Sequence, residues 1–472
     1  MKNEELKKYL ENQIVQAPFR LEGYTKDFNG RPLLKREIYS LLDGYAKDFQ
    51  TSGAGPQIVV MPGLRGVGKT TLIAQLFLNL SGNILKLYLS VDEIVKRFGA
   101  TLWDVISVYE ELIEQHIEKL DKPLFLFLDE IHYEANWASF LKSMFDRSKK
   151  VFIFCAGSAA LLLREQINVD LARRAFFTDI HPMSFREYLM LKSGKMFKKT
   201  LANVENILQA AGASELFERL KEDERAVRDH WLDIDRLELN NYLKLGTLPF
   251  ALSLSNKQVA LDYIGQIINK VIYSDIPQFS RFDIGTLNKI EKLLYILSDS
   301  LSISVTSLSE LLEMKKDTLS LVLNGLEKAG VVVRIPPYGV HHKQIRKPSK
   351  YLFALPSLRF FFLNSRESTR NFDIYKGSLF EDIAGMYLAA FLPKYGPSSL
   401  TYDVAKGGAD FIIRSANKKI VVEVGLDGKG IKQVQNTLAR IEGDYGLVVS
   451  DSDLSYDDRI IKIPLEQFLL ML

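Results

Sequence analysis

The sequence predicts an α/β protein with a parallel sheet and a helical lid, followed by a winged helix-turn-helix and a small α/β domain. Between residues 58 and 180, short and continuously apolar strands alternate with helical stretches, which is typical of a parallel sheet buried on both faces. Between residues 289 and 354, three short helical patterns precede two strand patterns, the order found in a winged helix. The last hundred residues return to alternating helices and strands.

The strands of the first sheet are predicted from runs of apolar residues bounded by polar ones. They are Ile58–Met61, Ile84–Ser90, Leu124–Leu128, Val151–Cys155 and Phe176–Ile180. The stretch from about 186 to 285 is helical and charged, without a strand pattern, and this predicts the lid. The predicted segments are a core at 1–190, a lid at 191–285, a winged helix at 286–365 and an α/β domain at 366–472.

Length and composition set broad limits. The chain has 472 residues, which corresponds to about three domains by length alone. Its net charge of +3 says almost nothing about partners, so any nucleic-acid surface must come from local clustering. Cys155 is the only cysteine, which excludes an intrachain disulfide and a cysteine-based zinc site. We expect a cytoplasmic protein without a membrane segment, because no signal-peptide pattern and no apolar run of about 18–20 residues occurs.

A phosphate-binding loop is indicated by Gly63–Thr70, which matches the pattern G-x-x-x-x-G-K-[ST] in full. The loop follows the strand Ile58–Met61 and precedes a helical stretch, so backbone N–H groups and a helix N-terminus can face a phosphate. In this pattern Lys69 contacts the β- and γ-phosphates, and the Thr70 hydroxyl binds Mg²⁺. The predicted nucleotide-binding residues are Gly63, Arg65, Gly66, Val67, Gly68, Lys69, Thr70 and Thr71.

Two acids follow the apolar strand Leu124–Leu128. Ligands of open α/β sheets bind beyond the carboxyl ends of the strands, which would place Asp129 and Glu130 beside the phosphate loop. We expect Asp129 to hold Mg²⁺ and Glu130 to orient or deprotonate the attacking water. The interval of about 60 residues between loop and acids has room for the strand Ile84–Ser90, as in the ATPase class with an intervening strand.

Two further residues are candidates for catalysis. Ser158 follows the strand Val151–Cys155, where its hydroxyl can contact the γ-phosphate or the water. The alternative is that it caps the helical stretch Ala159–Leu163. Arg174 precedes the fifth strand, from which an arginine can stabilise charge on a neighbouring subunit's γ-phosphate. The alternative is a solvated arginine at a helix end.

The sequence resembles the prokaryotic AAA+ ATPases that carry a winged helix and a restriction-endonuclease-like module at the C-terminus. The resemblance extends from about Phe19 to Val449. The sequence segments that carry the resemblance are Gly63–Thr70, Phe127–His132, Ala156–Ser158, Leu171–Arg174, Pro182–Tyr188 and Tyr242–Pro249. It implies an AAA+ P-loop ATPase core, ATP and Mg²⁺ as cofactors, ATP hydrolysis, and assembly into oligomers. The family's usual L-x-G-R is Leu-Ala-Arg-Arg here, which weakens the assignment of Arg174 as an arginine finger.

The third helical pattern after residue 286, Asp317–Ala329, is the candidate recognition helix. Its apolar positions keep helical spacing and predict one buried face, which leaves Lys315, Lys316, Ser320 and Asn324 pointing outward. Basic residues crowd the predicted wing: His341, His342, Lys343, Arg346, Lys347 and Lys350. Double-stranded DNA is therefore a candidate partner, with the helix in the major groove and the wing on phosphates. The alternative is a wing that docks on the protein's own domains.

The last domain matches the PD-(D/E)XK nuclease pattern in the order of its elements. Asp410 and Glu423 form the acid pair, with Glu381 on the preceding helix, and two or three such carboxylates can share a Mg²⁺ that activates water. Gly425 stands where the pattern requires a lysine. The lysines that could take over its role are Lys419 and Lys429. The alternative is an inactive nuclease fold used for docking or assembly.

Three functional hypotheses remain open from the sequence. The first is an ATPase whose nucleotide state controls association with double-stranded DNA. The second is a regulatory or signalling switch whose C-terminal domains bind a protein partner or a second copy of the chain, with ATP controlling assembly. The third is an ATP-gated metal nuclease. DNA-stimulated ATP hydrolysis, nucleotide-dependent oligomer size and DNA cleavage distinguish the three.

Overall fold

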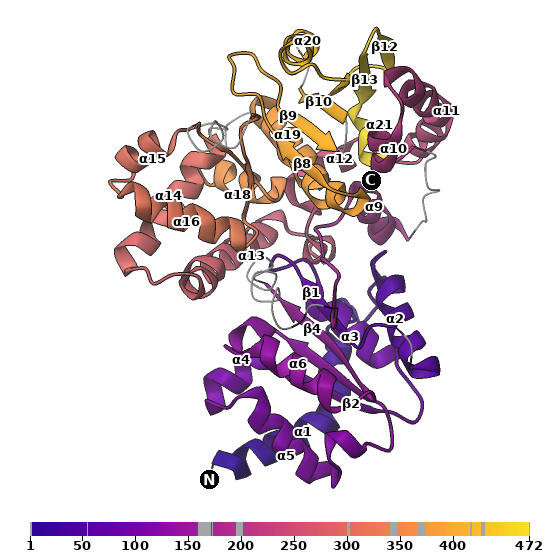
Figure 1. The fold of residues 1–472 in the computed structure, drawn as a ribbon, viewed down its shortest axis with the longest axis vertical. Helices are drawn as coiled ribbons and strands as arrows, with labels where there is room; N and C mark the ends of the chain where they lie inside the picture. Colours follow the sequence, from indigo (N-terminus) through magenta and orange to yellow (C-terminus); the bar gives the residue numbers. More distant parts are fainter. Residues whose placement is uncertain are drawn as a thin grey trace. The chain divides into compact units, whose positions relative to one another are not determined.

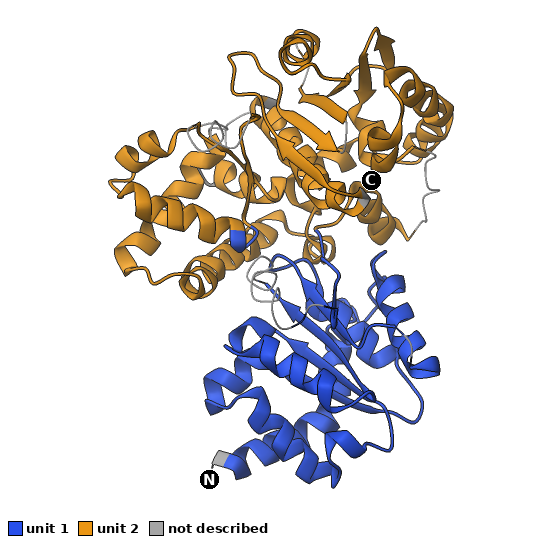
Figure 2. Ribbon diagram, viewed as in Figure 1, with its two compact units in different colours: residues 1–181, 328–330 blue, residues 182–327, 331–472 orange. Residues whose placement is uncertain are grey.

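The computed structural model describes residues 2–471 apart from 54, 159–170, 172, 195–201, 300–302, 340–346, 367–372, 416–417 and 426–429. The predicted helix Ala159–Leu163 and four of the basic wing residues, His341, His342, Lys343 and Arg346, lie outside the described residues, as does Lys429. The chain forms two compact units, with residues 1–181 and 328–330 in unit 1 and residues 182–327 and 331–472 in unit 2 (Figure 2).

Unit 1 contains a five-stranded parallel sheet with helices on both faces (Figure 1). Its strands are β1 (Ile58–Pro62), β2 (Leu85–Ser90), β3 (Leu124–Asp129), β4 (Val151–Gly157) and β5 (Ala175–Phe177). Its α-helices are α1 (Lys2–Gly23), α2 (Tyr39–Ser52), α3 (Lys69–Asn79), α4 (Val91–Glu93), α5 (Leu102–Ile113) and α6 (Trp137–Arg147). The parallel sheet predicted for this part of the chain is confirmed, and β5 is shorter than expected.

The order of strands in this sheet is β2-β3-β4-β1-β5. The strand between β1 and β3 is therefore β4, paired through Ile58 with Ile153 on one side and through Leu124 with Val151 on the other. The sequence interval places β2 between the loop and the acids along the chain, but in space β2 lies at the sheet edge. The strand predicted in the interval between the loop and the acids is present as β2, and the strand that lies between β1 and β3 in space is β4.

Alternation along the strands explains the burial of both faces, because successive side chains of a strand point to opposite sides. Leu124, Leu126 and Leu128 join a core formed with α1, α5 and α6. Phe125 and Phe127 point to the other face, where their rings contact rings of α2 and α3. The continuous apolar run of β3 is thus a strand covered on both sides.

Unit 2 begins with helices α9 to α13 and contains a hairpin and a six-stranded sheet. Its helices are α9 (Phe185–Ser193), α10 (Val204–Gln209), α11 (Ala213–Leu232), α12 (Leu237–Asn241), α13 (Lys257–Lys270), α14 (Ile284–Asp299), α15 (Val305–Leu311), α16 (Lys316–Lys328), α18 (Pro356–Arg366), α19 (Asp373–Phe391), α20 (Gly430–Ile441) and α21 (Leu465–Leu470). Its strands are β6 (Val332–Ile335), β7 (Lys350–Phe353), β8 (Ser398–Thr401), β9 (Phe411–Ser415), β10 (Lys418–Val424), β11 (Tyr445–Ser450), β12 (Ser455–Asp457) and β13 (Ile460–Pro464).

The six-stranded sheet of unit 2 has the order β12-β13-β11-β10-β9-β8. Strands β8, β9 and β10 are antiparallel neighbours, whereas β11 runs parallel to β10 and to β13. The parallel step from β10 to β11 is made through α20. This sheet brings Asp410, just before β9, close to Glu423 on β10.

Helices α14 to α16 and the antiparallel hairpin β6–β7 occupy the part predicted as a winged helix. On α16 the apolar face is buried through Leu319, Val322, Leu323 and Leu326. The prediction that Lys315, Lys316, Ser320 and Asn324 face outward is confirmed, since all four are exposed.

The boundary between the units lies nine residues before the predicted end of the core. The segment after residue 181 packs inside unit 2: Phe185 N donates to the Tyr387 hydroxyl at 2.7 Å, and the Tyr242 hydroxyl donates to Met183 O at 2.8 Å. Because unit 2 is compact as a whole, the finer boundaries at 285 and 365 stay a prediction.

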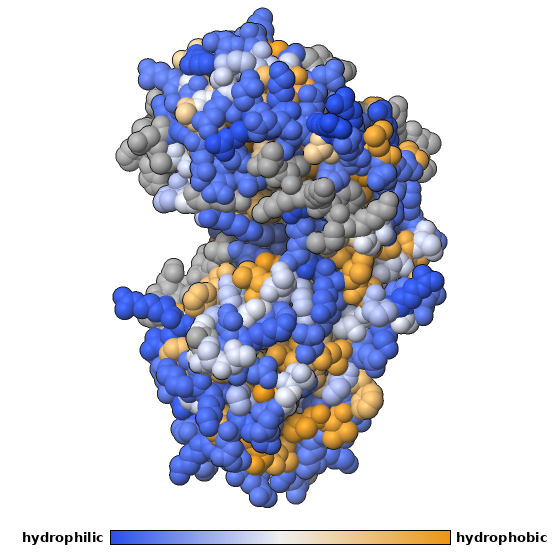
Figure 3. Space-filling view, turned by 90° about the vertical axis from the view of Figure 1, so that its right-hand side faces the viewer, coloured by the Kyte–Doolittle hydropathy of each residue, from blue (hydrophilic) through white to orange (hydrophobic). Residues whose placement is uncertain are grey.

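The surface of the molecule is mixed in character. On the face drawn in Figure 3, hydrophilic residues cover most of the surface and hydrophobic residues form small separate groups. Across the described chain, none of the helices combines the length and apolar composition that crossing a bilayer requires.

Candidate functional site

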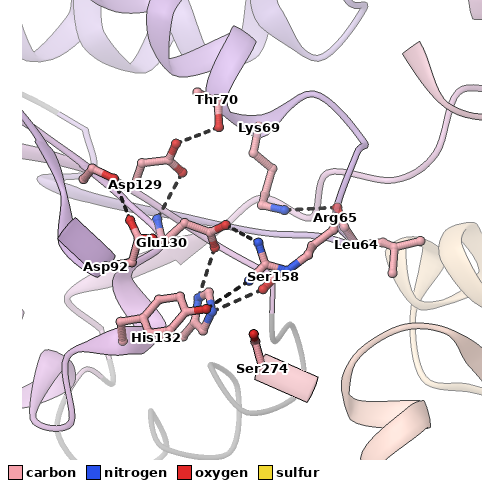
Figure 4. Close-up of polar contacts among 12 residues, drawn as sticks. Leu64, Arg65, Lys69, Thr70, Asp92, Asp129, Glu130, His132, Ser158 and Ser274 are labelled. Atoms are coloured by element: carbon pink, nitrogen blue, oxygen red, sulfur yellow. Dashed lines mark hydrogen bonds and ion pairs between the residues drawn. The ribbon is translucent and has the colours of Figure 1, made fainter. Parts of the chain in front are cut away.

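The candidate site of unit 1 lies where β1, β3 and β4 end. These strands are parallel, so their carboxyl ends share one edge of the sheet. The phosphate loop follows β1, Asp129 is the last residue of β3, and Ser158 follows β4. Figure 4 shows the side chains of Lys69, Thr70, Asp129 and Glu130 gathered at this edge.

The loop after β1 has the backbone of a phosphate cradle. Gly66 and Gly68 have φ values of 85° and 93°, in the left-handed region that favours glycine. A Cβ at Gly63 would lie 2.5 Å from the carbonyl oxygen of Ile180, so this position accepts only glycine without movement of the backbone. The Arg36 guanidinium donates to Val67 O at 2.7 Å and holds the loop from outside.

Lys69 begins helix α3, and its ammonium lies over the loop. Its Nζ donates to Gly63 O at 2.7 Å and to Leu64 O at 3.0 Å. Figure 4 draws the contact with Leu64. The residue is 7% exposed, so a buried positive charge is held against the backbone of the loop. A group with several negative charges is the ligand that such an arrangement favours.

Thr70 and Asp129 connect the loop to β3. The Thr70 hydroxyl donates to Asp129 Oδ2 at 2.6 Å, while Asp129 Oδ1 accepts from Glu130 N at 3.0 Å. Burial, and then the neighbouring Glu130, raise the pKa of Asp129 to about 6, although Thr70 and Lys69 act in the opposite direction. The hydroxyl and carboxylate oxygens together are hard ligands of the kind that Mg²⁺ prefers.

Glu130 is held by two neighbours that the spacing of the motifs does not reveal. Its Oε1 accepts from Arg65 Nη1 at 2.5 Å, and its Oε2 lies 3.4 Å from His132 Nδ1. The other ring nitrogen of His132 lies 3.3 Å from the Ser158 hydroxyl. Glu130 itself has a φ of 55°, an uncommon backbone conformation for this residue type. The carboxylate is therefore positioned by Arg65 and His132, and Ser158 contributes through its contact with His132.

Other predicted residues of this site are less central. Thr71 is the third residue of helix α3 and is partly buried. Arg174 contacts helix α6, where its Nε lies 3.2 Å from Asp146 Oδ1 and its guanidinium covers the Phe145 ring. An action of Arg174 on a neighbouring subunit stays a prediction.

Sequence reasoning expected Arg65 to line the nucleotide and gave His132 no role of its own. The available signal was the position of His132 two residues after Glu130, in a short turn that follows a buried strand. The tertiary contact of Arg65 with Glu130, across 65 positions of sequence, had no such signal.

The second predicted acid pair lies in unit 2. Asp410 N donates to Glu423 Oε2 at 3.0 Å, and Val424 N donates to Asp410 Oδ2 at 3.0 Å. Burial, and then the charge of Asp410, raise the pKa of Glu423 to about 8. Each carboxylate thus accepts a hydrogen bond from a backbone N–H at or beside the other acid.

The cation beside this pair is Lys350. Its Nζ donates to Asp410 Oδ1 at 3.0 Å and forms an ion pair with Glu381 of α19. This corrects the expectation that Lys350 belongs to an exposed wing, because the residue is 6% exposed. Lys419, a candidate for the missing nuclease lysine, instead donates to Ile441 O at 2.8 Å. A Cβ at Gly425 would meet no atom of the described residues within 4 Å.

Acidic residues near one another do not by themselves form a metal site, which also requires a suitable arrangement of ligands. In the described parts of both units, His, Cys, Asp and Glu residues form no group of three or more arranged to hold a metal ion. Asp410 and Glu423 as metal ligands stay a prediction, as do Thr70 and Asp129.

The loop, the paired acids and the order of the strands define a P-loop nucleotide-binding protein. In agreement, residues 55–189 match the family model described as an AAA domain, and residues 236–369 match a domain of unknown function, DUF8612. Most of the residues that match the AAA domain, 55–181, lie in unit 1.

The chain belongs to the same protein family as the uncharacterized protein MJ1637 of Methanocaldococcus jannaschii. The two are 35% identical over 475 residues, which cover 99% of this chain and 94% of that protein. An uncharacterized protein of Haemophilus influenzae is 21% identical over 402 residues, 82% of this chain and 87% of that protein.

Among solved structures, the Thermotoga maritima RuvB Holliday junction branch migration motor is similar at 17% identity. The match covers 66% of this chain and 92% of that chain, with a TM-score of 0.26. A likeness this distant says nothing about the roles of individual residues.

Proposed function

We propose that unit 1 binds ATP with Mg²⁺ and hydrolyses it. The observation that carries this proposal is the contact between Thr70 and Asp129, which joins the phosphate loop to the end of β3 at 2.6 Å. A hydroxyl from the loop and a carboxylate from the neighbouring strand end are the protein ligands that a P-loop supplies to a nucleotide-bound magnesium ion.

The residues around this contact fit both ligands. The backbone of Gly63–Thr70 would hold the phosphates together with the Lys69 ammonium, and Thr70 and Asp129 would hold the metal. Bound Mg²⁺ would neutralise charge on the phosphate oxygens. The choice of ATP over other nucleotides rests on the AAA domain at residues 55–189.

Glu130 is the proposed base or water-orienting group. Its carboxylate lies next to Asp129 along the chain and is fixed by Arg65 and His132. A fixed carboxylate can accept a proton from a water held between it and the γ-phosphate, which is general-base catalysis. Ser158 contacts His132 and so helps to position Glu130. This role does not depend on a direct contact of Ser158 with the phosphate.

The test is the rate of ATP hydrolysis by the full chain, comparing wild type with Lys69→Ala. We expect both nucleotide binding and turnover to be lost in the variant, because the buried ammonium is removed from the loop. Lys8→Ala is the matched control, since this lysine of unit 1 is exposed on helix α1. An unchanged rate in the Lys69 variant would contradict the proposal.

A coupling of nucleotide state to double-stranded DNA is a second proposal, and α16 supports it. The exposed Lys315, Lys316, Ser320 and Asn324 lie at one side of a helix whose other side is buried. Positive and hydrogen-bonding side chains on a packed helix are suited to phosphates and base edges. Hairpin β6–β7 gives less support for DNA binding, because Lys350 forms ion pairs with Glu381 and Asp410 of unit 2.

The competing proposal is a switch in which ATP controls assembly through protein contacts of unit 2. ATPase stimulation by duplex DNA favours the first alternative, and a nucleotide-dependent change in oligomer size without stimulation favours the second. A metal nuclease has less support, because Gly425 replaces the expected lysine and an ammonium already lies among the acids.

A further inference from the structure

His132 lies between two other polar residues of the candidate site in unit 1. It is the middle residue of the short turn Ile131–Tyr133, which follows β3. Its Nδ1 lies 3.4 Å from Glu130 Oε2, and its Nε2 lies 3.3 Å from the Ser158 hydroxyl (Figure 4). The three side chains therefore form one line of polar groups, with the imidazole in the middle.

The geometry of these contacts favours one tautomer of the imidazole. Nε2 is hydrogen-bonded to the Ser158 hydroxyl, which accepts when Nε2 carries the proton. The 3.4 Å between Nδ1 and Glu130 Oε2 is longer than an ordinary N–H···O hydrogen bond, about 2.7–3.2 Å. A separation of this length fits two acceptors that face each other without a proton between them. The lone pair of Nδ1 therefore faces the carboxylate.

The two oxygens of the Glu130 carboxylate have different neighbours. Oε1 accepts from the Arg65 guanidinium at 2.5 Å, whereas Oε2 faces the imidazole. Protonation of Glu130 removes the negative charge of this ion pair, so a proton taken from water is poorly stabilised on the carboxyl group. Glu130 therefore needs a second group to receive the proton, and His132 lies beside its Oε2.

The imidazole is more deeply buried than the carboxylate. The side chain of His132 is 0% exposed, and that of Glu130 is 20% exposed. The Tyr133 ring packs against the imidazole, with the ring centroids 4.6 Å apart, and this contact keeps the ring in place. A proton that reaches His132 can therefore return to water through Glu130, the more exposed member of the pair.

We propose that His132 accepts the proton that Glu130 takes from the attacking water and holds it until the products leave, while Ser158 fixes the tautomer. The inference rests on the proposed hydrolysis of ATP in unit 1. As Glu130 takes the proton, the hydroxide forms a bond to the γ-phosphorus, and the bond from this phosphorus to the bridging oxygen breaks with its electron pair going to ADP. The proton then passes from Glu130 to Nδ1, which leaves a carboxylate beside an imidazolium. After product release, the imidazolium returns the proton to water through Glu130.

The experiment compares wild type, His132→Asn and His132→Ala as full-length chains, by steady-state phosphate release and by ATP binding. Asparagine keeps a polar group opposite Glu130 but cannot take up a proton, so it separates proton transfer from positioning. We expect kcat to fall about 10²-fold in both variants while the affinity for ATP is unchanged. His116→Asn is the matched control and should keep the wild-type rate, because this histidine of unit 1 is exposed.

The tautomer of His132 supplies a second readout, in the wild-type protein. In a chain with ¹⁵N-labelled histidine, the nitrogen shifts of His132 should place the proton on Nε2. Ser158→Ala removes the acceptor of that proton, so the ring signal that this variant shifts identifies His132. This measurement does not depend on the stability of the His132 variants.

Two results would overturn the inference. One is wild-type turnover in His132→Asn, because a polar contact with Glu130 would then be sufficient. The other is a proton on Nδ1 of wild-type His132, because the ring would then donate to Glu130 instead of accepting from it. A wild-type chain that binds no ATP and hydrolyses none would instead remove the proposed function on which the inference rests.

Discussion

At the scale of single residues, Glu130 depends on contacts made by side chains far from it along the chain. Arg65 comes from the phosphate loop and Ser158 from the end of β4, and both act on Glu130 directly or through His132. The loop, the sheet and the turn after β3 must all be folded before the carboxylate is held. A substitution at any of these residues is therefore expected to change the rate of ATP hydrolysis more than the affinity for ATP.

Replacement of Glu130 by Gln separates hydrolysis from binding. The amide keeps the size of the side chain but cannot accept a proton, so we expect ATP affinity to be retained and kcat to fall by about 10²- to 10⁴-fold. Measurements of ATP binding by calorimetry and of phosphate release test this. Glu134→Gln is the control, because that nearby acid accepts instead from Leu102 N. Equal turnover in wild type and Glu130→Gln would exclude Glu130 as the base.

The raised pKa of Asp129, about 6, gives Mg²⁺-dependent ATP binding a pH dependence. Above about pH 6 the carboxyl is ionised and can bind the metal, and below it the proton and the metal compete. The gain in ATP affinity on adding Mg²⁺ should therefore be constant from pH 7 to 8. Below pH 6 it should fall by up to about tenfold per pH unit.

The control for this titration is Asp129→Asn. ATP itself takes up protons equally in both measurements, but the variant lacks the Asp129 carboxyl. Its Mg²⁺-dependent gain should be small at neutral pH and should not show the additional loss below pH 6. A wild-type profile that parallels that of Asp129→Asn would contradict the role of Asp129 as a metal ligand.

The part of the site that depends on chain order was predictable, and the part that depends on tertiary contact was not. Gly63–Thr70 and the acids Asp129 and Glu130 lie at strand ends, so strand order and direction bring them together. No periodicity relates Arg65 to Glu130 or Lys350 to Glu381. These pairs form because separate elements pack, and charges on packed elements find partners when they are buried.

At the scale of elements, the same distinction applies to the sheets. The apolar runs predicted β1, β3 and β4 closely because continuous burial leaves a continuous pattern. The position of β2 at the edge could not be predicted, since sequence order does not determine spatial order in a parallel sheet. The Pro182–Tyr188 segment makes hydrogen bonds with Thr247 and Tyr387 of unit 2, whereas the match to the AAA domain, like the predicted core, includes this segment.

Helices α14, α18 and α19 are joined around a buried ion pair. Arg359 donates to both carboxylate oxygens of Asp382, at 2.5 and 2.9 Å, and to Ser298 O at 2.8 Å. Both side chains are fully buried, and burial raises the pKa of Asp382 despite its partner. The pair therefore holds three elements of unit 2 at once.

We expect Asp382→Asn to lower the free energy of unfolding of unit 2 by about 3–5 kcal/mol, because it leaves Arg359 buried without a countercharge. Asp229→Asn is the matched control, since its ion pair with Arg225 is exposed and contributes at most about 1 kcal/mol. Urea denaturation followed by the fluorescence of Trp231, which lies in α11, measures the difference. Similar effects of the two variants would show that the buried pair is not the stabilising contact.

At the scale of the whole molecule, a net charge of +3 gives no general attraction to nucleic acid. DNA binding therefore has to come from a local surface, and α16 supplies one with Lys315 and Lys316 at its start. If ATP hydrolysis in unit 1 is coupled to DNA, duplex DNA should raise the ATPase rate, and loss of this surface should remove the stimulation while basal turnover remains.

The salt dependence of DNA affinity tests this surface quantitatively. Each lysine that neutralises a phosphate adds about 0.9 to the slope of log K against log salt, so Lys315→Ala with Lys316→Ala should reduce the slope by about 2. The control pair, Lys257→Ala with Lys292→Ala, removes the same charge from exposed positions of α13 and α14. Equal slopes for the two double variants would locate the contact elsewhere. Absence of binding and stimulation in wild type, together with a nucleotide-dependent change in oligomer size, would instead support assembly through protein contacts.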